Sequence, residues 1–145
     1  MKAVIQRVLD ATLKVDGEVI SQIGKGYVIF LGVGKGDGKE QADYMTKKIP
    51  PLRICEDENG KINKSILDEK GEILLVSQFT LCADTSHGNR PSFFEAETPE
   101  KANELYLYVA EGLRAQGVSV KLGVFGADMK ITQTNDGPFT IILKK

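Results

Sequence analysis

The chain has 145 residues, of which 41% are hydrophobic, 27% charged and 7% aromatic, an average composition for a globular domain. Folding a chain of this length removes roughly 70% of its unfolded surface from water, so a core forms without metal or disulfide support. We therefore expect one domain over residues 1–145. Nineteen Lys and Arg against twenty Asp and Glu leave a net charge of -1, which excludes a general nucleic-acid coat protein. Binding of one particular RNA stays open, because phosphate contacts need only a local basic patch.

The two cysteines, Cys55 and Cys82, lie far apart in a chain that needs no disulfide, which favours reduced thiols. Charged residues interrupt the first twenty positions, so no apolar stretch of a signal peptide is present there. No run of 18 apolar residues occurs either. We expect a cytoplasmic protein.

The first part of the chain is rich in β-branched residues and predicts strands. The strand patterns cover Ala3 to Val8, Ala11 to Val15, Val19 to Ile23 and Gly26 to Val33. Asp16-Gly17 is a hairpin turn signal between the second and third of them. The fourth is a continuous apolar run, which is typical of a strand buried on both faces.

Helical spacing of apolar residues appears twice. Glu40 to Ile49 predicts a first helix, which Pro50-Pro51 would end. The second opens with Thr98 as N-cap and Pro99 at the first helical position, and Gly117 is its expected stop.

Further strand patterns surround these helices. They cover Leu52 to Cys55 and Ile62 to Leu67 as a second hairpin, then Ile73 to Cys82, Val118 to Leu122, Met129 to Thr134 and Phe139 to Leu143. About eight strands and two helices predict an α+β fold with a largely antiparallel or mixed sheet.

Common chemical motifs fail on their spacing. The glycine-rich stretch from Gly32 to Lys39 follows a strand, but Val33 and Glu40 stand where a phosphate loop needs Gly and Ser or Thr, so a turn is expected. His87 is the only histidine, and it lies in a polar loop that favours a solvated side chain. With one histidine and no close Cys or His pair, no metal site is predicted.

Polar residues interrupt the most apolar strand pattern at Ser77-Gln78-Phe79-Thr80. Buried polar groups cost free energy unless they have partners, so these residues need an explanation. If the strand persists, Gln78 and Thr80 share one face with Cys82, while Ser77 and Phe79 lie on the other. A functional site and a strand end with backbone-bonded hydroxyls both explain the pattern.

A second unusual segment is Asn135-Asp136-Gly137-Pro138-Phe139-Thr140. A Gly-Pro pair between two strand-like runs can form a plain turn. It can also expose backbone N–H and C=O groups without side-chain obstruction, which suits a binding element. Both interpretations stay open on these residues alone.

These two motifs, in this order, resemble the D-aminoacyl-tRNA deacylase family, and the resemblance covers the whole chain. It is carried by six segments: Met1 to Val8, Leu52 to Ile54, Val76 to Leu81, Arg90 to Phe93, Phe125 to Met129 and Asn135 to Pro138. It implies a single domain with a barrel-like sheet and two main helices.

The resemblance also implies an activity: hydrolysis of the ester that joins a D-amino acid, or mischarged glycine, to tRNA. It implies tRNA as the partner, no cofactor or metal, and a homodimer with active sites at the subunit interface. In this family a Gly-Pro pair, held cis, rejects L-amino acids by steric exclusion, which assigns substrate binding to Gly137 and Pro138. Arg7 is expected to hold that pair, although an exposed strand arginine is the alternative.

The same resemblance assigns the catalytic motif to Ser77, Gln78, Phe79 and Thr80. No histidine or lysine in the motif could activate Thr80 as a nucleophile, so we favour water activated with help from the 2'-OH of the terminal adenosine. Backbone N–H groups near Phe79 and Thr80 would then stabilise the oxyanion. Phe79 is also expected to contact the terminal adenine, with a core aromatic as the alternative. Two other classes stay in view, a tRNA-binding protein without catalysis and a hydrolase that depends on Cys82.

Overall fold

The computed structural model describes residues 1–145. Its elements are, in chain order, β1 (Lys2–Val15), β2 (Glu18–Ile23), β3 (Gly26–Gly32), α1 (Lys39–Lys48), β4 (Cys55–Glu56), β5 (Ile62–Lys64), β6 (Glu72–Ser77), the 3-10 helix η1 (Phe79–Cys82), α2 (Pro99–Ala115), β7 (Ser119–Leu122) and β8 (Lys130–Lys144). No helix is long and apolar enough to cross a membrane.

The main sheet is mixed, as predicted, and its order is β2-β1-β3-β6-β7 with β8 paired to β1. β1 pairs antiparallel with β2, β3 and β8, whereas β3-β6 and β6-β7 are parallel pairs. The parallel pairs follow from the helices, because a crossover through a helix brings the chain back in the same direction.

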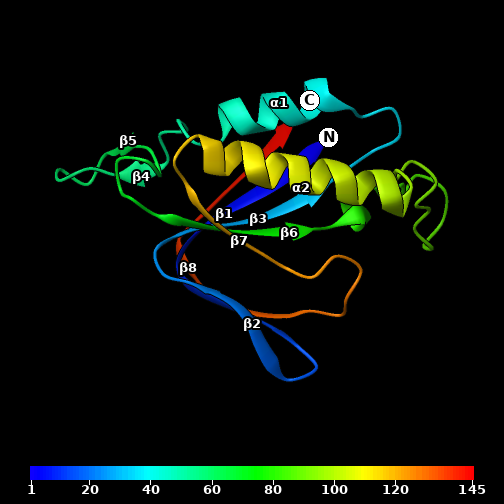
Figure 1. Ribbon diagram of the computed structural model, residues 1–145, viewed down its shortest axis with the longest axis horizontal. Coiled ribbons are helices and arrows are strands. Elements are labelled where there is room, and N and C mark those ends of the chain that lie inside the picture. The colour runs from blue at the N-terminus through cyan, green and yellow to red at the C-terminus, as the bar shows by residue number, and fades with distance from the viewer.

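The sheet curls toward a barrel below the helices (Figure 1). β2 is bonded to β1 along one edge, and its other side meets β7 through two hydrogen bonds. The Ser21 hydroxyl donates to the Leu122 carbonyl at 2.6 Å, and Lys121 Nζ donates to the Gln22 carbonyl at 2.7 Å. These bonds bring the two ends of the sheet together without a full ladder.

Both helices cover the same face of the sheet, and α1 lies beside α2 in Figure 1. The apolar stripe of α2 is buried as its spacing predicts, with Leu105, Tyr106 and Val109 each at most 5% exposed. They pack with alternate residues of β3, such as Tyr27 and Ile29, in the larger of two cores. Burial of this face holds the helices on the sheet.

The opposite face of the same strands forms a second, smaller core inside the curled sheet. It contains Val28 of β3, Leu74 and Val76 of β6, and Leu13 of β1. β3 is therefore buried on both faces, as its continuous apolar run predicts.

The prediction of a strand over Ile73 to Cys82 is wrong beyond Ser77, where β6 ends and η1 begins. The partner strand β3 ends at Gly32, so no ladder continues past the Leu31–Ser77 pair. The chain turns instead, and the Leu81 N–H donates to the Gln78 carbonyl. A Cβ on Gly32 would lie 2.9 Å from Leu81 Cβ, so glycine allows η1 to pack over this strand end.

The two pairs of strands predicted at the chain ends are single long strands, β1 and β8. In β8, Asn135 pairs with Val8 and Thr140 with Gln6, so the segment Asp136 to Phe139 bulges out opposite Arg7. The plain turn considered for the Gly-Pro segment is therefore a bulge within one strand, because β1 continues past it and keeps pairing on both sides.

The structure also differs from the predictions in the second hairpin and at the start of the second helix. β5 ends at Lys64 because Ser65 and Asp68 cap a turn, in which the Ser65 N–H donates to Asp68 Oδ2 at 2.8 Å. Thr98 is the N-cap of α2 as predicted, but its side chain makes no capping bond. Gly117 follows the helix with φ +90°, which confirms the predicted stop.

Candidate active site

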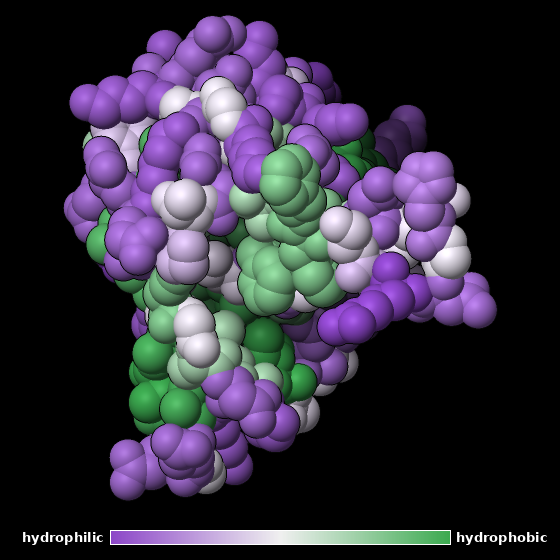
Figure 2. All heavy atoms as spheres, turned by 90° about the vertical axis from the view of Figure 1, so that its right-hand side faces the viewer, coloured by the Kyte–Doolittle hydropathy of each residue, from purple (hydrophilic) through white to green (hydrophobic).

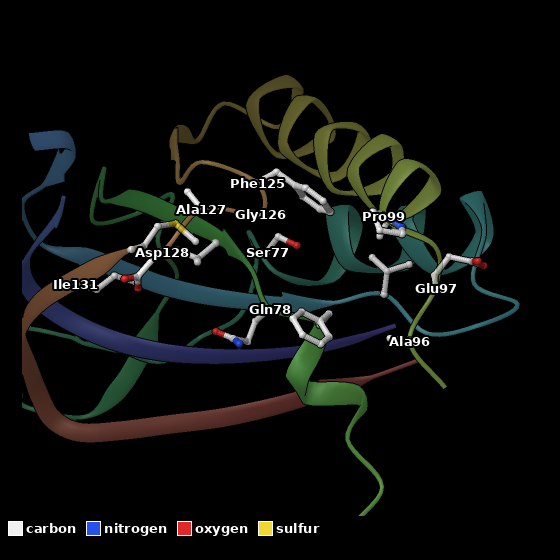
Figure 3. Close-up of a pocket in the computed structure, with 15 residues that line it drawn as sticks. Ser77, Gln78, Ala96, Glu97, Pro99, Phe125, Gly126, Ala127, Asp128 and Ile131 are labelled. Atoms are coloured by element: carbon white, nitrogen blue, oxygen red, sulfur yellow. The ribbon is translucent and has the colours of Figure 1, made fainter. Parts of the chain in front are cut away.

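A cavity of about 520 Å³ opens where β6 passes into η1. Three segments surround it in Figure 3: the end of β6, the start of α2, and the loop that precedes β8. Its walls are formed by Val33, Val76, Ser77, Gln78, Phe79, Ala96, Glu97, Pro99, Ala102, Phe125, Gly126, Ala127, Asp128, Met129 and Ile131. Nine of these 15 residues are hydrophobic, which suits an organic ligand held by a few polar groups.

Three of the four residues predicted as catalytic line this cavity, namely Ser77, Gln78 and Phe79. Thr80 lies outside the lining, but its hydroxyl accepts a hydrogen bond from Gln78 Nε2. The 3-10 turn thus brings Gln78 and Thr80 together, whereas strand geometry would have placed Cys82 with them. Phe79 is 54% exposed, so it is a surface residue and not part of the core.

The Gly137-Pro138 pair projects from β8 and is exposed. Its peptide bond is cis, and Gly137 has φ +128°. A Cβ on Gly137 would lie 2.8 Å from the backbone nitrogen of Phe139, so the position accepts no side chain without rearrangement.

Arg7 lies behind this bulge and is 3% exposed, so it is a buried arginine. Its Nε donates to the Asp136 carbonyl at 3.2 Å and lies 3.1 Å from Asp136 Oδ2. Nη1 donates to the Ile54 carbonyl at 2.9 Å, and Nη2 to Glu56 at 3.3 Å. One guanidinium therefore ties β1, the β4 hairpin and the bulge together, which needs the planar fork that only arginine has.

The two predicted halves of the site are not brought together within one chain. Neither Gly137 nor Pro138 lines the cavity of Ser77. β1 and β3 lie between β8 and β6, which separates the two by roughly 14 Å across the sheet. The bulge also lies level with Arg7, whereas Ser77 lies level with Ala3, roughly 13 Å along β1.

The prediction of site residues missed the loop before β8 and the start of α2. Phe125 and Asp128 come from the loop, and Glu97 and Pro99 come from the helix start (Figure 3). The glycine-containing run Phe125 to Met129 between two strand patterns was the available signal. Its place at the cavity depends on the sheet curl, which no local pattern encodes.

The carboxylates that line the cavity each have a lysine partner. Lys101 Nζ lies 2.8 Å from Glu97, and this bond lowers the pKa of the carboxyl. Asp128 forms an ion pair with Lys130 at 2.9 Å. His87 is exposed in the loop that links η1 to α2, outside the lining. No cluster of three His, Cys, Asp or Glu side chains has a metal-binding arrangement.

Comparison with known sequences covers almost the whole chain. The family model described as D-Tyr-tRNA(Tyr) deacylase matches residues 4–144. A protein of Persephonella marina named D-aminoacyl-tRNA deacylase is 54% identical over 143 residues, covering 99% of this chain and 97% of that protein. A protein of the same name from Syntrophomonas wolfei is 51% identical over 143 residues, covering 99% and 96%.

Two solved structures share the fold. The c-Myc DNA unwinding element binding protein superposes with a TM-score of 0.94 at 44% identity, covering 100% of this chain and 99% of the other. A probable eukaryotic D-amino acid tRNA deacylase superposes with a TM-score of 0.80 at 15% identity, covering 98% and 97%. The barrel-like sheet with two helices is therefore the expected fold, and the chain belongs to the D-Tyr-tRNA(Tyr) deacylase family.

Proposed function

We propose that this chain hydrolyses the ester bond of D-aminoacyl-tRNA and releases the free D-amino acid and tRNA. The observation that carries the proposal is its match over almost the whole chain to proteins named D-aminoacyl-tRNA deacylase. The cavity at Ser77 to Phe79 supports it, because it is large enough for an aminoacyl group and its ribose. Editing of glycyl-tRNA(Ala) belongs to the same proposal.

The proposed chemistry uses water and the substrate's own 2'-OH. Gln78 is the hydrogen-bond partner of the Thr80 hydroxyl, and an amide cannot take up the proton that a nucleophilic Thr80 would have to lose. The N–H groups of Phe79 and Thr80 open η1 and have no carbonyl partner within it. In the proposed mechanism they would donate to the oxyanion that develops on the carbonyl oxygen of the ester.

The proposed chiral filter is the exposed Gly137-Pro138 pair. Its carbonyls would bind the amino group of the substrate, and its atoms would collide with an L side chain. A D side chain, or the hydrogen of glycine, leaves the same space free. Such a filter cannot reject glycine, because it recognises only a group that glycine lacks.

A homodimer would complete the site, since the filter and the catalytic corner lie apart in one chain. In the proposed assembly each bulge reaches the cavity of the partner subunit, and Arg7 supports it from behind. A two-fold dimer makes both contacts at once, because the same surface occurs on each subunit. The cytoplasm, where tRNA is charged, is the proposed location.

The alternative that uses Cys82 as nucleophile has less support. Cys82 lines a second cavity with Met1 and Lys2, not the cavity of Ser77. Burial raises the pKa of its thiol, so the reactive thiolate is disfavoured at neutral pH.

The deciding experiment is single-turnover hydrolysis of matched D-tyrosyl-, L-tyrosyl- and glycyl-tRNA by the metal-free protein. Release from the D and glycyl substrates with the L substrate intact is the expected result. Equal release of D and L would remove the chiral filter but keep an esterase. Binding without release would contradict the proposal and leave a non-catalytic tRNA-binding protein.

A further inference from the structure

Three phenylalanines are exposed: Phe79 of the cavity lining, and two on the loop that follows η1. Phe79 is 54% exposed, Phe93 37% and Phe94 74%. The rings of Phe79 and Phe93 pack edge to face with their centroids 5.0 Å apart. The loop that carries Phe93 and Phe94 forms the right-hand side of Figure 1, and Figure 2 shows a pale hydrophobic patch on that face, bordered by hydrophilic surface. Because Phe79 also lines the cavity, the aromatic patch continues directly from the proposed catalytic site.

The loop that carries the patch is held in place by backbone bonds. Asp84 and Ser92 exchange two hydrogen bonds of 2.8 and 2.9 Å across its base. The Lys35 N–H donates to the Glu95 carbonyl at 2.9 Å, and Gly34 forms a bridge with Ala96. The exposed rings therefore stand on a fixed support, which lowers the entropic cost of stacking a ligand on them.

One lysine borders the aromatic patch directly, and it shares a neighbouring cavity with two more that form no ion pair. Lys35 Nζ lies 3.1 Å from the ring centroid of Phe94, a cation–π contact. Lys35 also lines a second cavity of about 350 Å³, together with Lys2 and Lys144. None of these three lysines has a carboxylate within ion-pair distance, although Lys2 Nζ donates to the Leu81 carbonyl at 2.6 Å. Two carboxylates share this cavity: Asp37, which pairs with the Met1 ammonium at 2.6 Å, and Glu95, which has no cation partner, so the three lysines still outnumber the one unpaired acid.

We propose that the patch of Phe79, Phe93 and Phe94, with Lys35, Lys2 and Lys144 beside it, binds the single-stranded 3' end of the tRNA. The proposal rests on the proposed function and adds where the nucleotides before the terminal adenosine lie. Bases stack on the exposed phenylalanines, and phosphates lie against the unpaired lysines. Stacking on aromatic rings beside cations is how proteins bind single strands without reading their sequence.

Charge distinguishes this surface from a protein-docking patch. The cores of protein interfaces are depleted in lysine, because its ammonium is strongly hydrated and costly to bury. Here the Lys35 ammonium lies on the Phe94 ring itself, and Lys2 and Lys144 line the cavity beside it without a carboxylate partner. A polyanion with planar bases complements both features, whereas an apolar protein surface complements only the rings.

The test measures binding of uncharged tRNA, and of a labelled single-stranded oligoribonucleotide ending in CCA, by fluorescence anisotropy across a salt series. We expect Phe94→Ala to weaken binding about tenfold at every salt concentration, because one stacked base is lost. We expect Lys144→Gln to reduce the slope of log K against log salt by about 0.7, because one phosphate contact is lost. Leu107→Ala and Lys47→Gln change an exposed leucine and an exposed lysine on the helices, and both variants should bind as the wild type does.

Two results would overturn the inference. One is unchanged binding by Phe94→Ala, or an equal loss in the control variants. The other is a change from dimer to monomer in Phe94→Ala on sedimentation, which would make the patch a protein interface. Failure of the proposed function gives a different result. In that case the wild-type protein would bind both RNAs but would not hydrolyse D-aminoacyl-tRNA.

Discussion

The corner from Ser77 to Thr80 and the bulge from Asp136 to Phe139 are both breaks in regular strands, but their surroundings are opposite. The corner follows a strand buried on both faces, and its side chains line a cavity. The bulge is part of a strand that pairs on one side only, and Gly137 and Pro138 face outward. One is a concave surface backed by the core, and the other is a projection supported by a single arginine.

This difference shows how a chain of 145 residues can provide both a cavity and a protruding steric filter. A cavity needs packed walls, which only the core can provide, whereas a steric filter needs a rigid backbone that protrudes. The cavity lies at the end of an interior strand and the bulge on an edge strand of the same sheet, so each has the surroundings that it needs. In the proposed function, the complete site then depends on a second subunit.

The largest effect should come from Gly137→Ala. The added Cβ would lie 2.8 Å from the Phe139 nitrogen at φ +128°, so the bulge must change shape. We expect hydrolysis of D-tyrosyl-tRNA to fall at least about a hundredfold, the loss that a small misplacement at a reacting centre causes. Gly60→Ala is the matched control, because Gly60 has φ +71° with nothing within 4 Å and lies away from the site. Full activity of Gly137→Ala would refute the filter.

Mixing two inactive variants tests whether the two regions meet across subunits. We expect Gln78→Ala to disable the corner and Gly137→Ala the bulge, so that neither variant alone forms a dimer with a complete site. Random exchange makes half of the dimers mixed, each with one intact site, so about a quarter of wild-type activity should return. No recovery in mixtures whose mass spectra show mixed dimers would place both halves of the site in one chain.

Arg7→Lys should weaken the bulge without touching the corner. Lysine keeps the charge but cannot reach the Ile54 and Asp136 carbonyls together, so a buried acceptor loses its donor. We expect a loss of about 2 kcal/mol in the free energy of unfolding by denaturant titration. Turnover of D-tyrosyl-tRNA should fall about tenfold under conditions where the variant is folded. A stable variant with unchanged turnover would show that Arg7 does not hold the bulge.

Thr80→Ala should have a smaller effect, because Thr80 lies outside the cavity lining and is bonded to Gln78. If its hydroxyl only orients the amide, single-turnover hydrolysis should fall less than about tenfold. Rapid quenching followed by mass spectrometry provides the second readout. An aminoacyl group trapped on Thr80 would contradict the proposed water mechanism.

The smallest effect concerns an ion pair that belongs to neither region. Lys25 Nζ lies 2.6 Å from Glu69, and this hydrogen bond lowers the pKa of the Glu69 carboxyl. The stabilisation is therefore present above the unfolded pKa and is lost as pH falls through the lower folded pKa. Lys25→Met should be less stable by under about 1 kcal/mol at pH 7 and should match the wild type at acidic pH. If the difference in stability persisted at acidic pH, the effect would come from packing and not from the ion pair. If the variant changed the D/L selectivity, the ion pair would be linked to the site.

Much of the fold could be predicted from local patterns. The apolar stripe of α2 between Thr98 and Gly117 predicts its length and buried face, because a helix repeats every 3.6 residues whatever surrounds it. The two-sided burial of β3 follows from its unbroken apolar run. The end of β6 at Ser77 could not be predicted, because it depends on where the neighbouring strand β3 ends.

The sequence by itself determined the two unusual segments and, through their resemblance to a family, their proposed roles. Both segments interrupt a local sequence pattern: polar residues interrupt an apolar strand, and a Gly-Pro pair stands between two strand patterns. Such interruptions can be recognised without knowledge of the fold. Only the tertiary structure decided that Arg7 is buried behind the bulge, that Phe125 and Glu97 join the cavity, and that the two segments lie apart in one chain. These facts arise from the curl of the sheet and the order of its strands, which come from contacts between residues distant in sequence.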